Sequence, residues 1–273
     1  MDPKFQRRVQ RYGWDKAAGY YDAHWREQLE SVQRRLIELA SLREGERVID
    51  VACGTGLVSF RAASLVGPKG RVLGTDLSEG MLQLAQKVAS EQELPTVTFE
   101  RMDAEDLHIA DGSFDVALCS LGLMYVPDPE KAVKEMHRVL KPGGRAVISV
   151  WGRRDRCGWA EIFPIVDNRV KSEVCPLFFR IGTGATLRAT FEGAGFVNVV
   201  PEHFDVLLHF ASDEDACGAA FAGGPTALAY SRFLENVKNE VHAEYLASIE
   251  RFREGEGYAI PGEFVIAIGQ KPI

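Results

Sequence analysis

The chain has 273 residues, of which 46% are hydrophobic and 26% charged, ordinary values for a globular protein. Its formal net charge of −7 argues against a nucleic-acid partner or an anionic membrane surface. The first residues include no apolar stretch typical of a secretory signal, and no apolar run is long enough to span a membrane. The five cysteines form no C-x-x-C pair, so we expect a cytoplasmic protein without a metal site.

Strands and helices are predicted to alternate through the first half of the chain. The expected elements are helices within 4–42, a strand at 47–51, a helix to about 66, a strand at 71–75, a helix to about 91, strands at 96–101 and 114–119, a helix at 129–139 and a strand at 145–151. Short connections between such elements predict an α/β fold with a doubly wound, mostly parallel sheet. Ligands bind outside the carboxyl ends of the strands in such sheets.

The C-terminal part departs from this alternation. A helix near 184–194 is predicted to lead to a strand at 197–208, and the best candidate for the last strand is 263–269. The intervening residues include one predicted long helix at 226–252. A connection of that size is usually functional. We interpret it as a helical cap that shapes a substrate pocket together with the N-terminal helices and residues 152–182.

The most informative stretch is 47–56, which reads Arg-Val-Ile-Asp-Val-Ala-Cys-Gly-Thr-Gly. A strand ends in Asp50 and is followed by a loop of small residues, against which a ligand can lie because few Cβ atoms obstruct it. A second acid, Asp76, ends the next strand, where a carboxylate can accept both hydroxyl groups of a ribose. The pattern predicts a nucleoside-bearing cofactor across the ends of two neighbouring strands.

The glycine loop does not fit a dinucleotide. Ser59 stands where the third glycine of G-x-G-x-x-G is required, and the Asp50 carboxylate would repel a pyrophosphate. An acid at this position suits a cofactor with a cation near the loop, such as the amino group of a methionine moiety. These features disfavour a nucleotide-cofactor oxidoreductase, which stays as an alternative.

The motif resembles that of class I S-adenosylmethionine (SAM)-dependent methyltransferases, an acid followed by a G-x-G-x-G loop. Ala52 replaces the first glycine here, and we expect its Cβ to disfavour a positive φ. Four further segments resemble later motifs of the family in the right order: 76–82, 102–107, 113–120 and 140–144. The resemblance covers about residues 10–155, and the most similar subgroup is the ubiquinone/menaquinone C-methyltransferase-like small-molecule enzymes.

The resemblance implies a seven-stranded Rossmann-like sheet, SAM as cofactor and S-adenosylhomocysteine (SAH) as product. It implies that Asp76 binds ribose, that Leu77 packs on adenine and that Asp103 accepts the adenine amino group. The expected cofactor-binding residues are Tyr21, Asp50, Ala52, Cys53, Gly54, Gly56, Asp76, Leu77, Met81, Asp103, Ala104 and Ser120.

Aromatic residues near the N-terminus are the first candidates for substrate contact. Residues 18–22 match an A-x-x-Y-D segment that closes over the cofactor in related enzymes, and an aromatic face can attract a sulfonium. Ordinary core packing is the alternative for these aromatics. The expected acceptor contacts are Trp14, Tyr20, Met124, Tyr125 and Trp151.

Candidates for a general base are weaker. Tyr21, His24 and His203 are considered, but no pattern in the sequence gives any of them a partner, and His137 is interpreted as structural. Methyl transfer from a sulfonium is an in-line displacement that depends mainly on alignment, so a strong base is not required.

The favoured function is therefore SAM-dependent methyl transfer to an O, N, C or S atom of a small apolar or aromatic molecule. A non-catalytic SAM- or nucleoside-binding protein is the other alternative, and assembly as a homodimer is left open. The expected division of the chain is an N-terminal helical segment at 1–42, a cofactor-binding core at 43–208, a cap at 209–261 and the last core strand at 262–273.

Overall fold

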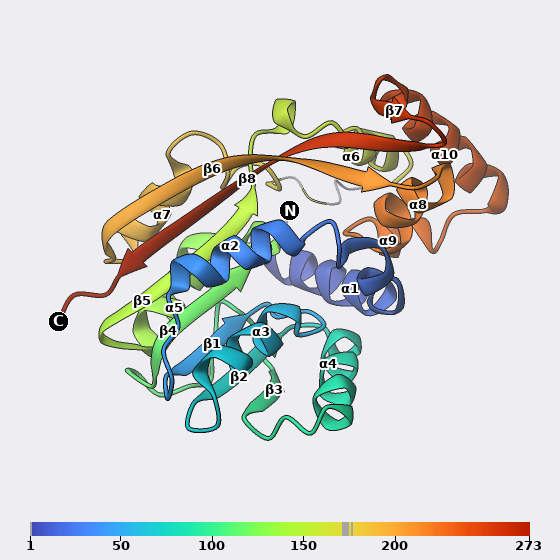
Figure 1. The fold of residues 1–273 in the computed structure, drawn as a ribbon. Helices are drawn as coiled ribbons and strands as arrows, with labels where there is room; N and C mark the ends of the chain where they lie inside the picture. The colour runs from blue at the N-terminus through green and yellow to red at the C-terminus, as the bar shows by residue number, and fades with distance from the viewer. Residues whose placement is uncertain (1, 171–174, 176) are drawn as a thin grey trace.

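A computed structural model describes residues 2–170, 175 and 177–273. Seven long strands form one sheet in the order β3-β2-β1-β4-β5-β8-β6 (Figure 1). They are β1 (Arg47–Val51), β2 (Arg71–Asp76), β3 (Val97–Arg101), β4 (Phe114–Ser120), β5 (Leu140–Trp151), β6 (Val197–Phe210) and β8 (Gly257–Gln270). The first five are parallel, and β8 is antiparallel to β5 and β6. The predicted doubly wound, mostly parallel sheet is confirmed.

Helices cover both faces of this sheet (Figure 1). They are α1 (Pro3–Trp25), α2 (Glu30–Ala40), α3 (Leu57–Val66), α4 (Glu79–Glu91), α5 (Pro129–Val139), α6 (Ile162–Asp167), α7 (Thr186–Gly193), α8 (Asp213–Cys217), α9 (Ala227–Tyr230) and α10 (Glu235–Ile249). Four of them begin at capping side chains that accept backbone amides: Asp2 for α1, Ser78 for α4, Asp128 for α5 and Ser212 for α8. The central strands are buried on both faces, as parallel strands between helix layers require.

The connection between β6 and β8 differs from the prediction. The expected long helix at 226–252 is divided into α9, α10 and a 3-10 turn, because the chain is extended at Leu234. The last strand begins at Gly257, before the predicted boundary at 262. It pairs with β6 along its length, with Tyr258 opposite Phe210 at one end and Gln270 opposite Val197 at the other. A two-residue strand, β7 (Arg253–Glu254), also pairs with β8 and was not predicted. Part of the predicted pocket segment 152–182, namely 171–174 and 176, lies outside the described residues.

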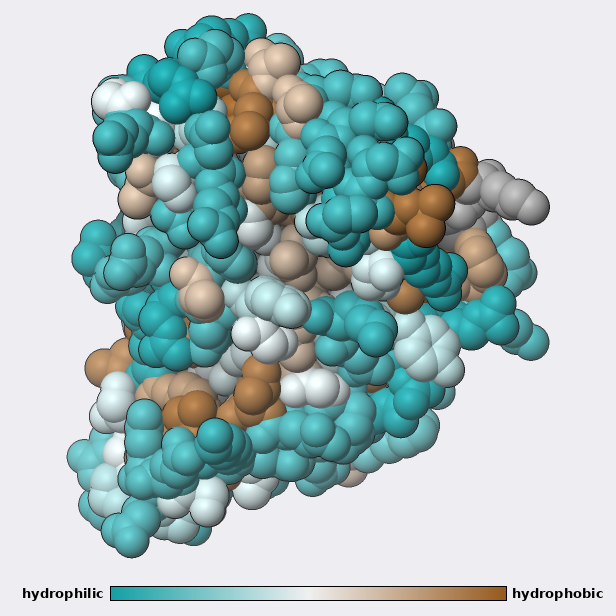
Figure 2. Space-filling view, turned by 90° about the vertical axis from the view of Figure 1, so that its right-hand side faces the viewer, coloured by the Kyte–Doolittle hydropathy of each residue, from teal (hydrophilic) through white to brown (hydrophobic). Residues whose placement is uncertain are grey.

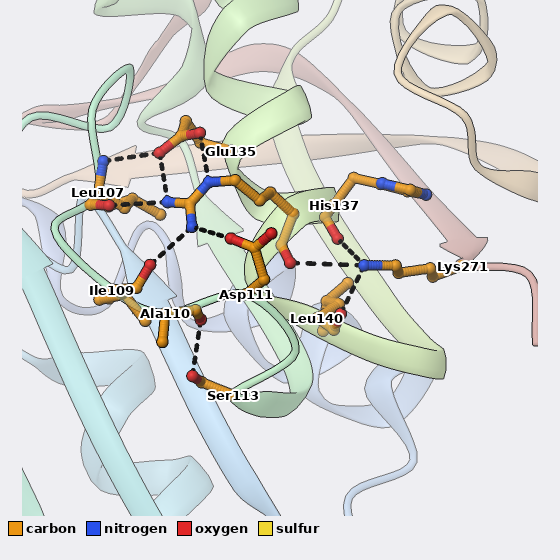
Figure 3. Close-up of polar contacts among 10 residues, drawn as sticks. Leu107, Ile109, Ala110, Asp111, Ser113, Glu135, His137, Leu140 and Lys271 are labelled. Atoms are coloured by element: carbon orange, nitrogen blue, oxygen red, sulfur yellow. Dashed lines mark hydrogen bonds and ion pairs between the residues drawn. The ribbon is translucent and has the colours of Figure 1, made fainter.

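The loop between β3 and β4 is held in place from α5 (Figure 3). The guanidinium of Arg138 donates to the carbonyl oxygens of Leu107 and Ile109 and pairs with Glu135 and Asp111. Five donors in a planar fork suit this set of acceptors, which a lysine could not match. Arg138 therefore fixes the loop that follows β3.

The end of α5 is tied to the C-terminal end of β8. Lys271 donates to the carbonyl oxygens of His137 and Leu140 (Figure 3). Burial and the charge of Lys271 lower the pKa of His137, whose ring packs edge-on against Phe196. These contacts support the interpretation of His137 as structural.

In the part of the chain that the structure describes, no helix combines the length and hydropathy needed to cross a membrane. Figure 2 views the molecule from the side of α4, α9 and α10. Hydrophilic residues cover most of this face, and apolar residues are visible in a hollow near its middle.

Candidate functional site

A cavity lies at the carboxyl ends of the parallel strands. Residues from the loops after β1 to β5 line it on one side, and α1 with the segment before α9 lines it on the other. The described lining residues are Arg7, Gln10, Trp14, Tyr21, Trp25, Leu29, Ala52, Gly54, Asp76, Leu77, Met81, Asp103, Ala104, Ser120, Leu121, Gly122, Tyr125, Val126, Pro127, Trp151, Trp159, Phe178, Gly224 and Pro225.

The loop after β1 has left-handed backbone at three positions. Ala52 has φ 56°, Gly54 has φ 56° and Gly56 has φ 85°. The expectation that Ala52 would disfavour a positive φ is therefore wrong. A Cβ built on Gly122, in the loop after β4, would lie 2.4 Å from the Cβ of Ala52. The alanine side chain is accommodated because the residue facing it has none.

Asp50, the last residue but one of β1, is a buried carboxylate that is only partly satisfied. One oxygen accepts a hydrogen bond from the Ser59 hydroxyl at 2.6 Å, and among the described residues Oδ1 has no hydrogen-bond partner. Burial raises the pKa of Asp50 to about 7. A second, smaller cavity is lined by Asp50 together with Tyr21 and Cys53. A buried oxygen with an unused lone pair beside a cavity fits the amino cation that the sequence predicts there.

Asp76 ends β2 in a fixed orientation. Its Oδ2 accepts the Gly54 amide at 2.9 Å and its Oδ1 accepts the Ser78 amide at 2.8 Å. Burial raises the pKa of this carboxyl group too. A carboxylate has about four acceptor positions, so two remain for hydroxyl donors from the cavity. This arrangement fits a ribose.

Asp103 follows β3 and contacts the N-terminal helix. Its Oδ1 accepts the Glu105 amide at 2.9 Å, and its Oδ2 lies 2.8 Å from Nε of Arg7. Leu77, which the resemblance implies packs on adenine, and Met81, another expected cofactor contact, line the same cavity. Three carboxylates therefore stand at the ends of three adjacent strands, as the sequence predicts.

Two groups of aromatic side chains line the cavity. Trp14 packs edge-on against Tyr21 and Tyr125, with ring centroids 5.9 Å and 5.0 Å apart. Trp159 packs against Trp151 at 4.8 Å. Burial raises the pKa of both tyrosines, so each phenol stays protonated near neutral pH. All four tryptophans of the chain line the cavity: Trp14, Trp25, Trp151 and Trp159.

Several lining residues were not predicted from the sequence. Arg7, Gln10 and Trp25 share one face of α1 with Trp14 and Tyr21, at intervals of three, four or seven residues. That helical stripe is the signal that could have identified them. Trp159 and Phe178 reach the cavity through tertiary packing, and no local pattern marks them.

Five predicted residues line neither cavity, whereas Asp50 and Cys53 line only the smaller one. Gly56 is the N-cap of α3 and faces Phe60 and Phe99, and Met124 is buried in the core. Tyr20 is 55% exposed, because it lies on the outer face of α1 while Tyr21 lies on the inner face.

The two candidate histidines also lie elsewhere. His24 packs against Gly218 and Gly223 of the connection between β6 and β8. His203 lies on the edge strand β6 with a half-exposed side chain, and its Nδ1 is 3.6 Å from Glu263. Their positions do not support a role as catalytic base.

Comparisons with known proteins agree with this geometry. A family model described as a methyltransferase domain matches residues 42–162. The nocamycin O-methyltransferase of Saccharothrix syringae is 33% identical over 227 residues, which cover 77% of this chain and 80% of that protein. A demethylmenaquinone methyltransferase of Listeria monocytogenes is 35% identical over 146 residues, 54% of this chain and 60% of that one.

The fold is shared with a solved structure of the phosphoethanolamine N-methyltransferase 2 of Haemonchus contortus in complex with SAM. The TM-score is 0.62 at 17% identity, with 95% of this chain and 57% of that chain covered. The fold, the acidic residues at the three strand ends and the extent of the match to the Saccharothrix enzyme lead to one conclusion. The chain belongs to the class I SAM-dependent methyltransferases, and SAM is its methyl donor.

Proposed function

We propose that this enzyme methylates a small apolar or aromatic molecule, and that the cavity described above holds both the cofactor and the acceptor. One observation carries the proposal. The cavity has an acidic part at the ends of β2 and β3 and an aromatic part formed around Trp151, Trp159 and Phe178, and the smaller cavity beside it is lined by Asp50 of β1. A polar cofactor and an apolar acceptor would each find matching surroundings there.

In this proposal the acidic part binds the cofactor. Asp76 accepts the ribose hydroxyls, Asp50 accepts the amino group of the methionine moiety and Asp103 accepts the adenine amino group. Leu77 and Met81 pack beside the adenine. Support comes from the unpartnered Oδ1 of Asp50 and from the fixed carboxylate of Asp76.

Catalysis in this proposal depends on alignment and on exclusion of water. When bound, SAM supplies a methyl group that is already activated by the sulfonium charge. Tyr21, which lines both cavities, presents an aromatic ring beside that charge. The aromatic residues hold the acceptor in line with the methyl group, which converts a bimolecular step into an oriented one.

The nature of the acceptor is inferred from the aromatic part of the cavity. Its described lining around Trp25, Trp151, Trp159 and Phe178 consists of uncharged residues. Burying charged groups against such a surface would be unfavourable, whereas burying an aromatic ring gains about 25 cal/mol per Å². The names of the two relatives also refer to small acceptors, nocamycin and demethylmenaquinone.

The test is acceptor-dependent formation of SAH from SAM with a panel of phenols, quinols and aromatic carboxylic acids. We expect turnover with at least one class and methylated product by mass spectrometry. Asp76→Ala should abolish it, and Trp159→Ala should raise KM for the acceptor and leave SAH affinity unchanged. Binding of SAH without turnover of any member of the panel would contradict the proposed class of acceptor.

We also propose that the enzyme works in the cytoplasm on a small molecule and forms a homodimer. The five cysteines are all free, which supports a cytoplasmic location. The net charge of −7 disfavours a nucleic-acid substrate and so supports a small molecule. The edge strand β6 exposes Val200 and Leu207, which supports the third. Light scattering on the purified protein tests the assembly, and a monomeric mass would contradict it.

A further inference from the structure

Helix α1 is joined to the strand ends by polar contacts along its length. The Thr55 hydroxyl, after β1, donates to Asp22 at 2.6 Å. Asp15 accepts the Ser78 hydroxyl at 2.7 Å and the Gly80 amide at 3.0 Å, both after β2. The helix therefore closes one side of the cavity through these polar contacts and through the packing of Ala17 and Ala18 in a buried cluster with Met81.

A third contact involves the adenine end of the proposed cofactor site. Arg7 forms an ion pair with Asp103, its Nε lying 2.8 Å from Oδ2 but outside hydrogen-bond geometry, and it donates a hydrogen bond through Nη2 to Glu105. The side chain of Glu105 is 1% exposed, and its other oxygen accepts the Asp128 amide at 3.0 Å. Arg7 thus connects α1 to the loop after β3, and through Glu105 to the loop after β4.

The charges explain what Arg7 does there. Asp103 and Glu105 are two residues apart in the sequence, and both side chains contact Arg7. Their carboxylates therefore lie close together and repel each other. A planar guanidinium can serve two carboxylates at once from different nitrogens, which a lysine ammonium does less well. Without Arg7, the buried carboxylate of Glu105 would have no cationic partner among the described residues, and Asp103 would keep only its hydrogen bond from the Glu105 amide.

We propose that Arg7 is a positioning residue for adenine recognition. By holding Asp103 and Glu105 together, it orients the Asp103 carboxylate toward the adenine amino group, and it makes this orientation depend on closure of α1. The inference rests on the proposed function, in which Asp103 accepts that amino group. Arg7 does not contact the reacting atoms and acts through Asp103.

The test compares SAH with its 6-deamino analogue, in which hydrogen replaces the amino group of the base. Both are titrated calorimetrically into the wild-type protein, Arg7→Met, Arg7→Lys and the exposed control Arg8→Met. For Arg7→Met we expect the Kd of SAH to rise about tenfold, the value of one charge-assisted hydrogen bond, while the Kd of the analogue changes less than about twofold. Arg7→Lys should restore part of the difference, and Arg8→Met should behave as wild type.

A purely structural role for Arg7 would weaken both ligands by the same factor, and that result would overturn the proposal. An unchanged Kd for SAH would overturn it as well. If Arg7→Met does not fold, Glu105→Gln replaces it, since glutamine still accepts the Asp128 amide but attracts Arg7 less. Glu105→Gln must then lower the ratio of the Kd of the analogue to the Kd of SAH, and an unchanged ratio counts against the proposal.

Asp103→Ala, which removes the acceptor, separates this inference from the proposed function. If that variant keeps the full wild-type preference for SAH over the analogue, then Asp103 does not recognise the amino group and the assignment under the proposed function fails. If Asp103→Ala loses the preference and Arg7→Met keeps it, only the inference about Arg7 fails.

Discussion

The carboxylate of Asp76 accepts the backbone amide of Gly54 at 2.9 Å, so the acid that ends β2 is bonded directly to the glycine loop that follows β1. The Ser78 amide holds its other oxygen at 2.8 Å. Two backbone donors fix the carboxylate before any ligand arrives, and a rigid acceptor loses less entropy on binding. The position of the Asp76 carboxylate therefore depends on the glycine loop, and a substitution that moves the loop should move this carboxylate as well.

The loop after β1 should depend on the absence of a side chain at Gly122. Gly122→Ala places a Cβ 2.4 Å from that of Ala52, so we expect a loss of about 1–3 kcal/mol in the free energy of unfolding. Ala52→Gly in the same background should recover most of that loss, because it removes both the contact and the strain of a left-handed alanine. Denaturant unfolding measures both effects.

The control for that pair is Gly19→Ala, since a Cβ on Gly19 meets no atom within 4 Å. It should be neutral or slightly stabilising, because alanine favours a helix. Additive effects of the two substitutions at positions 52 and 122 would show that their side chains do not compete for the same space.

Asp50 should make the ligand-free protein less stable as pH rises. Its pKa is about 7 in the folded protein and 3.8 as the ordinary value, so between these values the folded state holds a proton that the unfolded chain releases. Stability from this group is therefore lost as pH rises from about 4 to about 7. Asp50→Asn should make stability depend less on pH in this range. At pH values above 7 the variant should unfold at a higher denaturant concentration than the wild type. An unchanged slope in the variant would contradict the assignment.

The same residue should couple cofactor binding to proton release. An amino cation next to Asp50 favours the carboxylate, so SAH binding below about pH 7 should release part of a proton. Calorimetry in buffers with different ionisation enthalpies measures the number released. Asp50→Asn should bind SAH more weakly and release none from this group, whereas equal release by both proteins would place the cation elsewhere.

Tryptophan fluorescence should report on the two parts of the cavity separately. Trp14 packs with Tyr21, which also lines the small cavity beside Asp50, whereas Trp159 packs with Trp151 and Phe178. We expect SAH to change the emission, Trp14→Phe to remove most of that change and Trp159→Phe to leave most of it. The reverse pattern would place the cofactor in the aromatic part.

Local sequence patterns were sufficient to predict the sheet and the positions of the three acidic residues. Each of Asp50, Asp76 and Asp103 directly follows or ends a strand whose apolar run is evident, and parallel strands bring their carboxyl ends to one edge. The backbone of Ala52 could not be predicted, because the space for its Cβ depends on Gly122, seventy residues further along the chain.

The aromatic part of the cavity and the contacts of Arg7 required the tertiary structure. Trp159 and Phe178 follow the fifth strand in a segment without a clear period, and only packing against Trp151 brings them to the cavity. Arg7 lies on the same helix face as Trp14, but its partners Asp103 and Glu105 are almost one hundred residues away. Helical spacing shows which residues lie on the same face of α1, but it does not show which residues that face contacts.

Calorimetric titration of SAH into the wild-type protein, Asp76→Ala and the exposed control Asp155→Ala tests the cofactor site most directly. We expect one SAH per chain for wild type and control, and a Kd raised about a hundredfold or more in Asp76→Ala, because two hydrogen bonds to a charged acceptor are lost. Equal binding by wild type and Asp76→Ala would contradict the placement of the cofactor at the ends of β1 and β2.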